Sequence, residues 1–129
     1  MKTEETNKLI AEFMEWEYKV LPVYSDDKFL GRKNIYNTPF KKHLKNKAFT
    51  TTFSENELVF HNDWNWLMEV VEKIESLNYS IEINKQEEND YQCLVVQKDI
   101  KVQTFSKIKI EAVYNACVEF IKFYNEQAK

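Results

Sequence analysis

Apolar residues recur at helical spacing in three stretches of the chain. These stretches cover residues 3–14, 63–77 and 106–127, and each combines an apolar stripe with charged residues on the opposite side. Asn78 follows the middle stretch and can adopt the left-handed conformation that often ends a helix. In the last stretch the stripe consists of Ile110, Val113, Tyr114, Cys117, Phe120, Ile121 and Tyr124. The sequence therefore predicts three amphipathic helices.

The middle helix begins in an unusual segment, FHNDWNWLM at residues 60–68, which holds two tryptophans. We expect Asn62 to be the N-cap and Asp63 to interact favourably with the positive end of the helix dipole. At 100° per residue, Trp64 and Trp66 lie about 160° apart around the axis. The apolar stripe predicted for this helix begins at Trp64 and continues with Leu67, Met68, Val71 and Ile74. We therefore expect Trp64 to be buried and Trp66 to lie at the margin.

Between the helices, apolar and polar residues alternate as they do in half-buried strands. Trp16, Tyr18 and Val20 alternate in this way, and we expect Pro22 to end the strand or to restrict it to a sheet edge. Further short strands are predicted at 29–30, 34–36, 49–53, 58–60, 79–83, 91–96 and 100–104. Residues 84–90 form a polar hairpin connection. The strand at 91–96 has apolar residues at both odd and even positions, which predicts a central strand covered on both faces.

The segment NTPFKKHLKNKAF at 37–49 predicts an additional short basic helix from Pro39 to Ala48. Thr38 and Pro39 make a good cap and first turn, and Phe40, Leu44 and Ala48 recur at every fourth position. The order of elements is then α-β-β-(short basic α)-β-α-β-β-β-α, without internal repeats or a linker. This order predicts one α+β domain over residues 1–129 with a mainly antiparallel sheet.

Composition restricts the classes of function. The chain has one glycine, which excludes glycine-rich phosphate loops and dinucleotide fingerprints, and no cofactor is expected. The net charge of -3 argues against bulk affinity for nucleic acids or anionic membranes. No apolar run reaches the length of a membrane span, and acids near the N-terminus do not fit a signal peptide, so we expect a cytoplasmic protein. Cys93 and Cys117 lack partners at ligand spacing, so no metal site is expected.

Three segments resemble the phage ABA sandwich family of small phage and prophage proteins. They are IAEFMEWEY at 10–18, LVFHNDWNWLMEVVEKIESLNY at 58–79 and SKIKIEAVYNACVEFIKFYNEQ at 106–127. The family pattern often has Gly where Glu15 stands. The resemblance implies a three-layer α/β/α sandwich and a phage or prophage origin, in the cytoplasm of a bacterial host. It implies no reaction and no catalytic residue, and it leaves residues 24–55 outside as a variable basic insertion.

The segment with His61, Asp63 and the two tryptophans has two interpretations, a catalytic or binding site and a helix start. As a site, His61 would be a general base oriented by Asp63, with a tryptophan stacking on a planar ligand. As a helix start, the same residues are a capping segment, and no nucleophile stands beside them. The second reading accounts for each position separately, so we expect no catalytic residues here and no enzymatic activity.

An interval without acids lies between Asp27 and Glu55 and contains seven of the eighteen basic residues. Aromatic residues are interleaved with them, a composition compatible with contact to phosphates of nucleotides or nucleic acids. A solvated basic face, or contact with an acidic protein, is the alternative. The candidate binding residues of this interval are Arg32, Lys33, Tyr36, Thr38, Lys41, Lys42, Lys45 and Lys47.

These observations lead to two main hypotheses of function, and an undescribed enzyme is the third. The leading one is a small non-enzymatic protein that binds a host or phage protein through the 24–55 region. A second copy of the chain is an additional partner to consider, with Trp66 and Phe123 as candidate interface anchors. The alternative is a protein that binds nucleotide or nucleic-acid phosphates through the lysine-rich 28–47 segment, for example to sequester a nucleotide signal.

Overall fold

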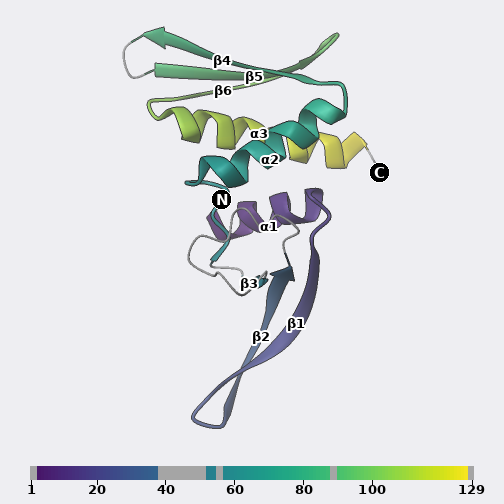
Figure 1. The fold of residues 1–129 in the computed structure, drawn as a ribbon, viewed down its shortest axis with the longest axis vertical. Coiled ribbons are helices and arrows are strands. Elements are labelled where there is room, and N and C mark those ends of the chain that lie inside the picture. Colours follow the sequence, from purple (N-terminus) through teal and green to yellow (C-terminus); the bar gives the residue numbers. More distant parts are fainter. Residues whose placement is uncertain (1–2, 38–51, 55–56, 88–89, 128–129) are drawn as a thin grey trace. The chain divides into compact units, whose positions relative to one another are not determined.

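The computed structural model describes residues 3–37, 52–54, 57–87 and 90–127. The chain divides into two compact units, Met1–Leu58 and Val59–Lys129. Figure 1 labels the helices and strands of both units.

The first unit starts with helix α1 (Thr3–Phe13). Glu4 and Glu5 occupy its first turn, where they interact favourably with the helix dipole. The buried Asn7 amide donates a hydrogen bond of 2.9 Å to the Leu58 carbonyl, which fixes the end of the unit to the helix. The predicted helix at 3–14 is confirmed.

A left-handed residue ends helix α1. Glu15 has a φ of 60°, and its N–H donates to the Glu12 carbonyl while the Trp16 N–H donates to the Ala11 carbonyl. This pair of hydrogen bonds is the Schellman arrangement, whose left-handed position favours glycine. The glycine that the phage ABA sandwich pattern often has at this position suits the observed backbone.

Three antiparallel strands follow in the order β1-β2-β3, with bounds Glu17–Ser25, Lys28–Asn37 and Thr52–Ser54. Strands β1 and β2 form a long hairpin whose two-residue turn, Asp26 and Asp27, has φ values of 50° and 63°. Positive φ at both turn residues matches the twist of the strands. The two short strands predicted at 29–30 and 34–36 are thus parts of one continuous strand, β2.

Pro22 lies inside strand β1, opposite Arg32. The expectation that it ends the strand is wrong, whereas the expectation of an edge strand is confirmed, because β1 pairs only with β2 among the described strands. A proline is tolerated there because its missing N–H can face away from the partner strand.

The second unit has the order α2 (Trp64–Ser76), β4 (Ser80–Glu87), β5 (Asp90–Gln97), β6 (Ile100–Ser106) and α3 (Lys109–Gln127). The strands form an antiparallel sheet with β5 in the centre, as expected for the strand at 91–96. Both helices lie on one face of this sheet (Figure 1). The Thr104 hydroxyl donates to the Ala112 carbonyl over 2.6 Å, which joins β6 to α3.

The core of the second unit lies between the sheet and its two helices. Cys93 and Val95 of β5 are fully buried against α3, and the ring of Phe120 packs edge-on against Tyr79 at 4.6 Å between centroids. On the opposite face of β5, Leu94 and Val96 are half-buried, and Phe105 beside them is 53% exposed. Both helices of this unit cover the same face (Figure 1), so the expectation that this strand is covered on both faces is wrong.

The α+β class and the antiparallel pairing are confirmed, and the described strands form two three-stranded sheets where one sheet was expected. Residues 58–60 are not a strand, because the Asn62 and Asp63 N–H groups both turn back to the Val59 carbonyl. The predicted hairpin connection at 84–90 is mostly strand, since β4 continues to Glu87. The predicted basic helix at 39–48 and most of the strand at 49–53 lie outside the described residues.

Candidate functional site

The exposed hydrophobic residues of the first unit gather on the β1–β2 hairpin. Tyr18, Val20, Pro22 and Tyr24 alternate along β1 and therefore share one face of it. The register places Tyr36, Arg32 and Phe29 on the same face, opposite Tyr18, Pro22 and Tyr24. We call this set of seven residues the hairpin face. Two ring contacts confirm the arrangement: Tyr18 with Tyr36 at 5.7 Å and Tyr24 with Phe29 at 5.8 Å.

Most of the hairpin face is open to solvent. Tyr18, Tyr24 and Phe29 are 54%, 61% and 55% exposed, and Val20 is 49% exposed. An aromatic side chain of about 200 Å² at this exposure presents about 110 Å², so the three rings together present about 330 Å². Patches of about 300–600 Å² are the largest that typical monomers expose, and they are often functional.

The other side of the hairpin is apolar as well. Leu21, which alternates with the hairpin face, is 44% exposed, and Leu30 is 63% exposed. Leu30 is the extra residue of β2 at the register shift between Val23 and Tyr24. Exposed apolar side chains thus extend beyond the seven residues of the hairpin face.

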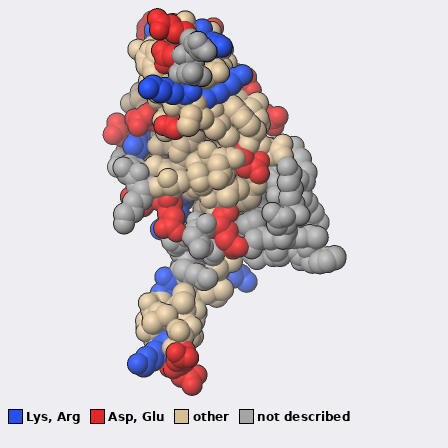
Figure 2. Space-filling view, turned by 90° about the vertical axis from the view of Figure 1, so that its left-hand side faces the viewer, with Lys and Arg blue, Asp and Glu red and all other residues tan. Residues whose placement is uncertain are grey.

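Charge is distributed unevenly along the hairpin. The strand residues 18–25 and 28–36 include Lys19, Lys28, Arg32 and Lys33 and contain no acid, whereas Asp26 and Asp27 form the turn. Figure 2 shows this end of the first unit as an uncharged surface flanked by basic side chains, with carboxylates at the tip. The hairpin body is thus apolar and basic within a chain whose net charge is -3.

The structure separates the candidate binding residues of the basic interval. Arg32 is exposed on the hairpin face, and Lys33 lies in β2. Tyr36 is 1% exposed and its ring packs against that of Tyr18, so it has no surface for a ligand. Thr38, Lys41, Lys42, Lys45 and Lys47 lie outside the described residues.

The segment around His61 is a helix start. Asp63, and not Asn62, is the N-cap of α2, and its Oδ1 accepts a hydrogen bond of 2.9 Å from the Asn65 N–H. Asp63 is therefore engaged with the helix backbone. The His61 ring lies 6.2 Å from that of Tyr114, and burial lowers its pKa, so the ring is neutral at pH 7. The structure thus gives Asp63 the capping role and places His61 beside Tyr114.

The two tryptophans exchange the positions expected for them. Trp66 is 3% exposed and packs edge-on against Phe60 at 5.2 Å, whereas Trp64 is 39% exposed. Met68, which was also expected in the buried stripe, is 42% exposed. Trp66 is therefore unable to act as an interface anchor without leaving the core. Phe123, the other candidate anchor, is half-buried on α3.

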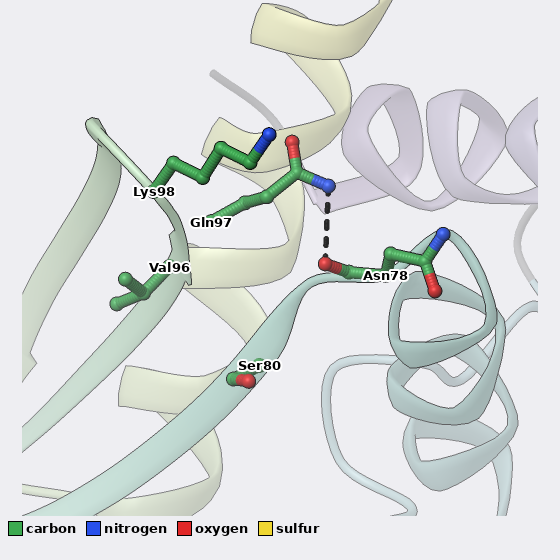
Figure 3. A pocket seen from close by; sticks show the side chains of 5 residues that line it. All are labelled: Asn78, Ser80, Val96, Gln97 and Lys98. Carbon is green, nitrogen blue, oxygen red and sulfur yellow. Dashed lines mark hydrogen bonds between the residues drawn. The ribbon is translucent and has the colours of Figure 1, made fainter.

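An open pocket lies where the end of α2 meets the turn between β5 and β6 (Figure 3). It holds about 530 Å³ and is lined by Asn78, Ser80, Val96, Gln97 and Lys98. The Gln97 amide donates to the Asn78 carbonyl over 3.0 Å, which holds the left-handed Asn78, with φ of 71°, against β5. Ser80 has no histidine or carboxylate beside it in this lining to act as its base.

The two cysteines are buried, free thiols in the core of the second unit. Burial raises the pKa of Cys93 to about 11. Burial also raises the pKa of Cys117, and the nearby Cys93 adds to this effect. Both thiols are therefore protonated and unreactive at neutral pH. Among the described residues, no group of three or more histidine, cysteine or acidic side chains is placed to hold a metal ion.

Within the described part of the chain, no helix is long and apolar enough to cross a membrane.

Comparison with known proteins supports the fold and leaves the activity open. No family model and no curated protein matches the chain, so the resemblance to the phage ABA sandwich family stays a prediction. A solved structure described as a phage protein from Bacillus cereus ATCC 14579 is similar, with a TM-score of 0.51 and 19% sequence identity. The match covers 92% of this chain and 90% of that one. The two chains therefore share a fold over nearly their full lengths.

Proposed function

We propose that this chain is a non-enzymatic binding protein and that the hairpin face is its contact surface for another protein. The observation that supports this proposal most strongly is the exposure of Tyr18, Tyr24 and Phe29 on one face of the β1–β2 hairpin. Large aromatic side chains with few rotatable bonds are the residues that anchor protein interfaces. Their ring contacts stabilise the hairpin, but more than half of each of the three residues stays exposed to water.

We propose further that the chain is a phage or prophage protein whose partner is a host or phage protein in the cytoplasm of a bacterial host. The similarity to a phage protein of Bacillus cereus supports the origin. The proposal of a binding role is also supported by the structural roles of the polar residues that sequence reasoning considered for catalysis, because Asp63 caps α2 and His61 packs beside Tyr114.

Co-purification with matched surface variants tests this function. The tagged chain is expressed in a bacterial host during phage infection, and co-purifying proteins are quantified by mass spectrometry. The test variant is Tyr24→Ser with Leu30→Ser, which removes two hairpin side chains that are 61% and 63% exposed. The control is Phe105→Ser with Ile108→Ser, at 53% and 57% exposure in the second unit.

We expect at least one protein to co-purify with the wild type and the control variant, and to be lost from the hairpin variant. Equal recovery with all three chains would show that the hairpin face is not the contact surface. Equal loss from both variants would indicate nonspecific binding to exposed apolar residues and would also contradict the proposal.

A second candidate function is binding of single-stranded nucleic acid or nucleotides by the same hairpin. It is favoured by Arg32, which shares a face with exposed aromatic rings on which bases can stack, and by Lys19 and Lys28 on the same hairpin. Val20, Leu21 and Leu30 favour protein instead, because aliphatic side chains gain little from contact with bases. Nucleic acid in the eluate that disappears steeply with added salt would support this alternative.

A further inference from the structure

The hairpin face also indicates the chemistry of its partner, an inference that rests on the proposed function. Basic residues of the strands are mixed with the apolar ones, and the acids stand at the two ends of the hairpin, with Glu17 at the start of β1 and Asp26 and Asp27 in the turn. Arg32 lies midway along the face, opposite Pro22, between the Tyr18–Tyr36 and Tyr24–Phe29 ring pairs. A partner that covers both ring pairs must therefore also cover the guanidinium.

Covering a guanidinium without pairing it is costly. An ion that loses its water shell needs a counter-charge or hydrogen-bond acceptors. Arginine presents a planar fork of donors that fits a carboxylate in a bidentate manner. The complement of the hairpin face is thus an apolar surface with a carboxylate near its centre.

The lysines Lys19 and Lys28 lie on the opposite side of the hairpin. Lys19 alternates with Tyr18 and Val20, Lys28 alternates with Phe29, and both lysines are exposed. Their positive charge would speed the encounter with a partner of opposite charge. Arg32 thus sets the need for a carboxylate at the hairpin face, and the lysines favour the approach of an acidic partner.

A second copy of this chain fits the face poorly. In a twofold face-to-face dimer, residues near the middle of the patch meet their own copies, which would bring Arg32 close to Arg32. Edge-to-edge pairing through β1 is opposed by Pro22, which supplies no N–H to a neighbouring strand.

We propose that the hairpin face receives an acidic, apolar polypeptide surface, with a partner carboxylate paired to Arg32 between the two ring pairs. The probe that tests this is a yeast-displayed library of random 16-residue peptides, selected against the full-length chain. Peptides that also bind the Tyr24→Ser, Leu30→Ser variant are removed, so that the remaining ones depend on the hairpin. We expect these peptides to be enriched in Asp and Glu together with aromatic and aliphatic residues.

Reversing the charge of Arg32 provides a second test. The Arg32→Glu variant should select peptides in which Lys or Arg replaces the acids. For one peptide from the wild-type selection, Arg32→Ala should weaken binding by about tenfold or more, as expected for loss of a hydrogen bond to a charged group. A Glu→Lys version of that peptide should bind the Arg32→Glu variant better than it binds the wild type.

The outcomes separate this inference from the function on which it rests. Hairpin-dependent peptides without an acidic bias, or with a bias that Arg32→Glu leaves unchanged, would overturn the acidic partner while leaving a protein-binding hairpin in place. A selection that yields no hairpin-dependent peptide would also overturn it, and co-purification would then decide the broader function. A concentration-dependent dimer in analytical ultracentrifugation that Tyr24→Ser abolishes would assign the face to a second copy and contradict the inference.

Discussion

Replacing Tyr24 with serine should lower the stability of the fold by less than a core substitution does, although it removes a large aromatic side chain. Tyr24 is 61% exposed, so folding covers 39% of the side chain. Full burial of a large apolar side chain is worth about 1.5–3 kcal/mol, so this covered share contributes about 1 kcal/mol. The edge-on contact with Phe29 at 5.8 Å adds about 0.5–1 kcal/mol in an exposed setting. The expected loss in the free energy of unfolding is therefore about 1–2 kcal/mol.

The same substitution should have a larger effect on binding. An aromatic residue that anchors an interface typically contributes about 2 kcal/mol or more, so its removal costs at least about 30-fold in affinity. Tyr24→Ser thus separates stability from function, whereas a core substitution lowers both together.

Urea denaturation followed by far-ultraviolet circular dichroism measures the stability of wild type and variant under identical conditions. Tyr24→Phe is the control, since it keeps the ring and removes only the hydroxyl. A loss above about 4 kcal/mol, which is typical of emptied cores, would refute the reasoning. It would mean that Tyr24 is covered in the folded protein and that the hairpin face is not available to a partner.

Three further predictions concern the second unit. Trp66→Ala should lower the free energy of unfolding by about 3–5 kcal/mol, and by clearly more than Trp64→Ala, because Trp66 is 3% exposed and Trp64 is 39% exposed; equal losses in urea denaturation would contradict the burial. Asn78→Gly should be tolerated and Asn78→Ala should cost about 1 kcal/mol, since φ is 71° there; a more stable alanine variant in thermal melts would contradict this backbone assignment. Burial lowers the pKa of His61 from its ordinary 6.5, so the unfolded chain takes up the proton first and stability should fall as pH decreases through 6.5. The His61→Gln variant should lose that part of the pH dependence in melts between pH 7.5 and 5, and an unchanged profile would show that His61 titrates normally.

The helices were the most predictable part of the fold, because a period of 3.6 residues persists over three or more turns in each. The pattern did not decide which flank of the stripe in α2 is buried. Leu67, Val71 and Ile74 belong to the predicted stripe and are buried, but the stripe can extend to Trp64 or to Trp66. Which flank is covered depends on the elements that pack against the helix. That information lies in distant parts of the chain.

The hairpin face was missed because sequence alternation measures apolar character and not burial. Tyr18 and Val20 alternate with polar residues as in a strand that buries one face, yet Tyr18 is 54% exposed and Val20 is 49% exposed. One signal was available in the run of apolar residues on both parities from Val20 to Tyr24. Such a run requires cover on both sides if all of its side chains are to be buried. The positive charge of Arg32 was recognised, but its position between two ring pairs depends on the register of β1 and β2.

Site-specific photo-crosslinking from the hairpin tests the central claim most directly. A benzophenone amino acid is placed at Tyr24 in one chain and at Glu72, on the exposed side of α2, in another. Both chains are irradiated in the bacterial host during phage infection. The account predicts a covalent adduct with a discrete protein from position 24, little or none from position 72, and a weaker adduct when Arg32→Glu is added. Crosslinking only to nucleic acid, or equal yields from both positions, would contradict it.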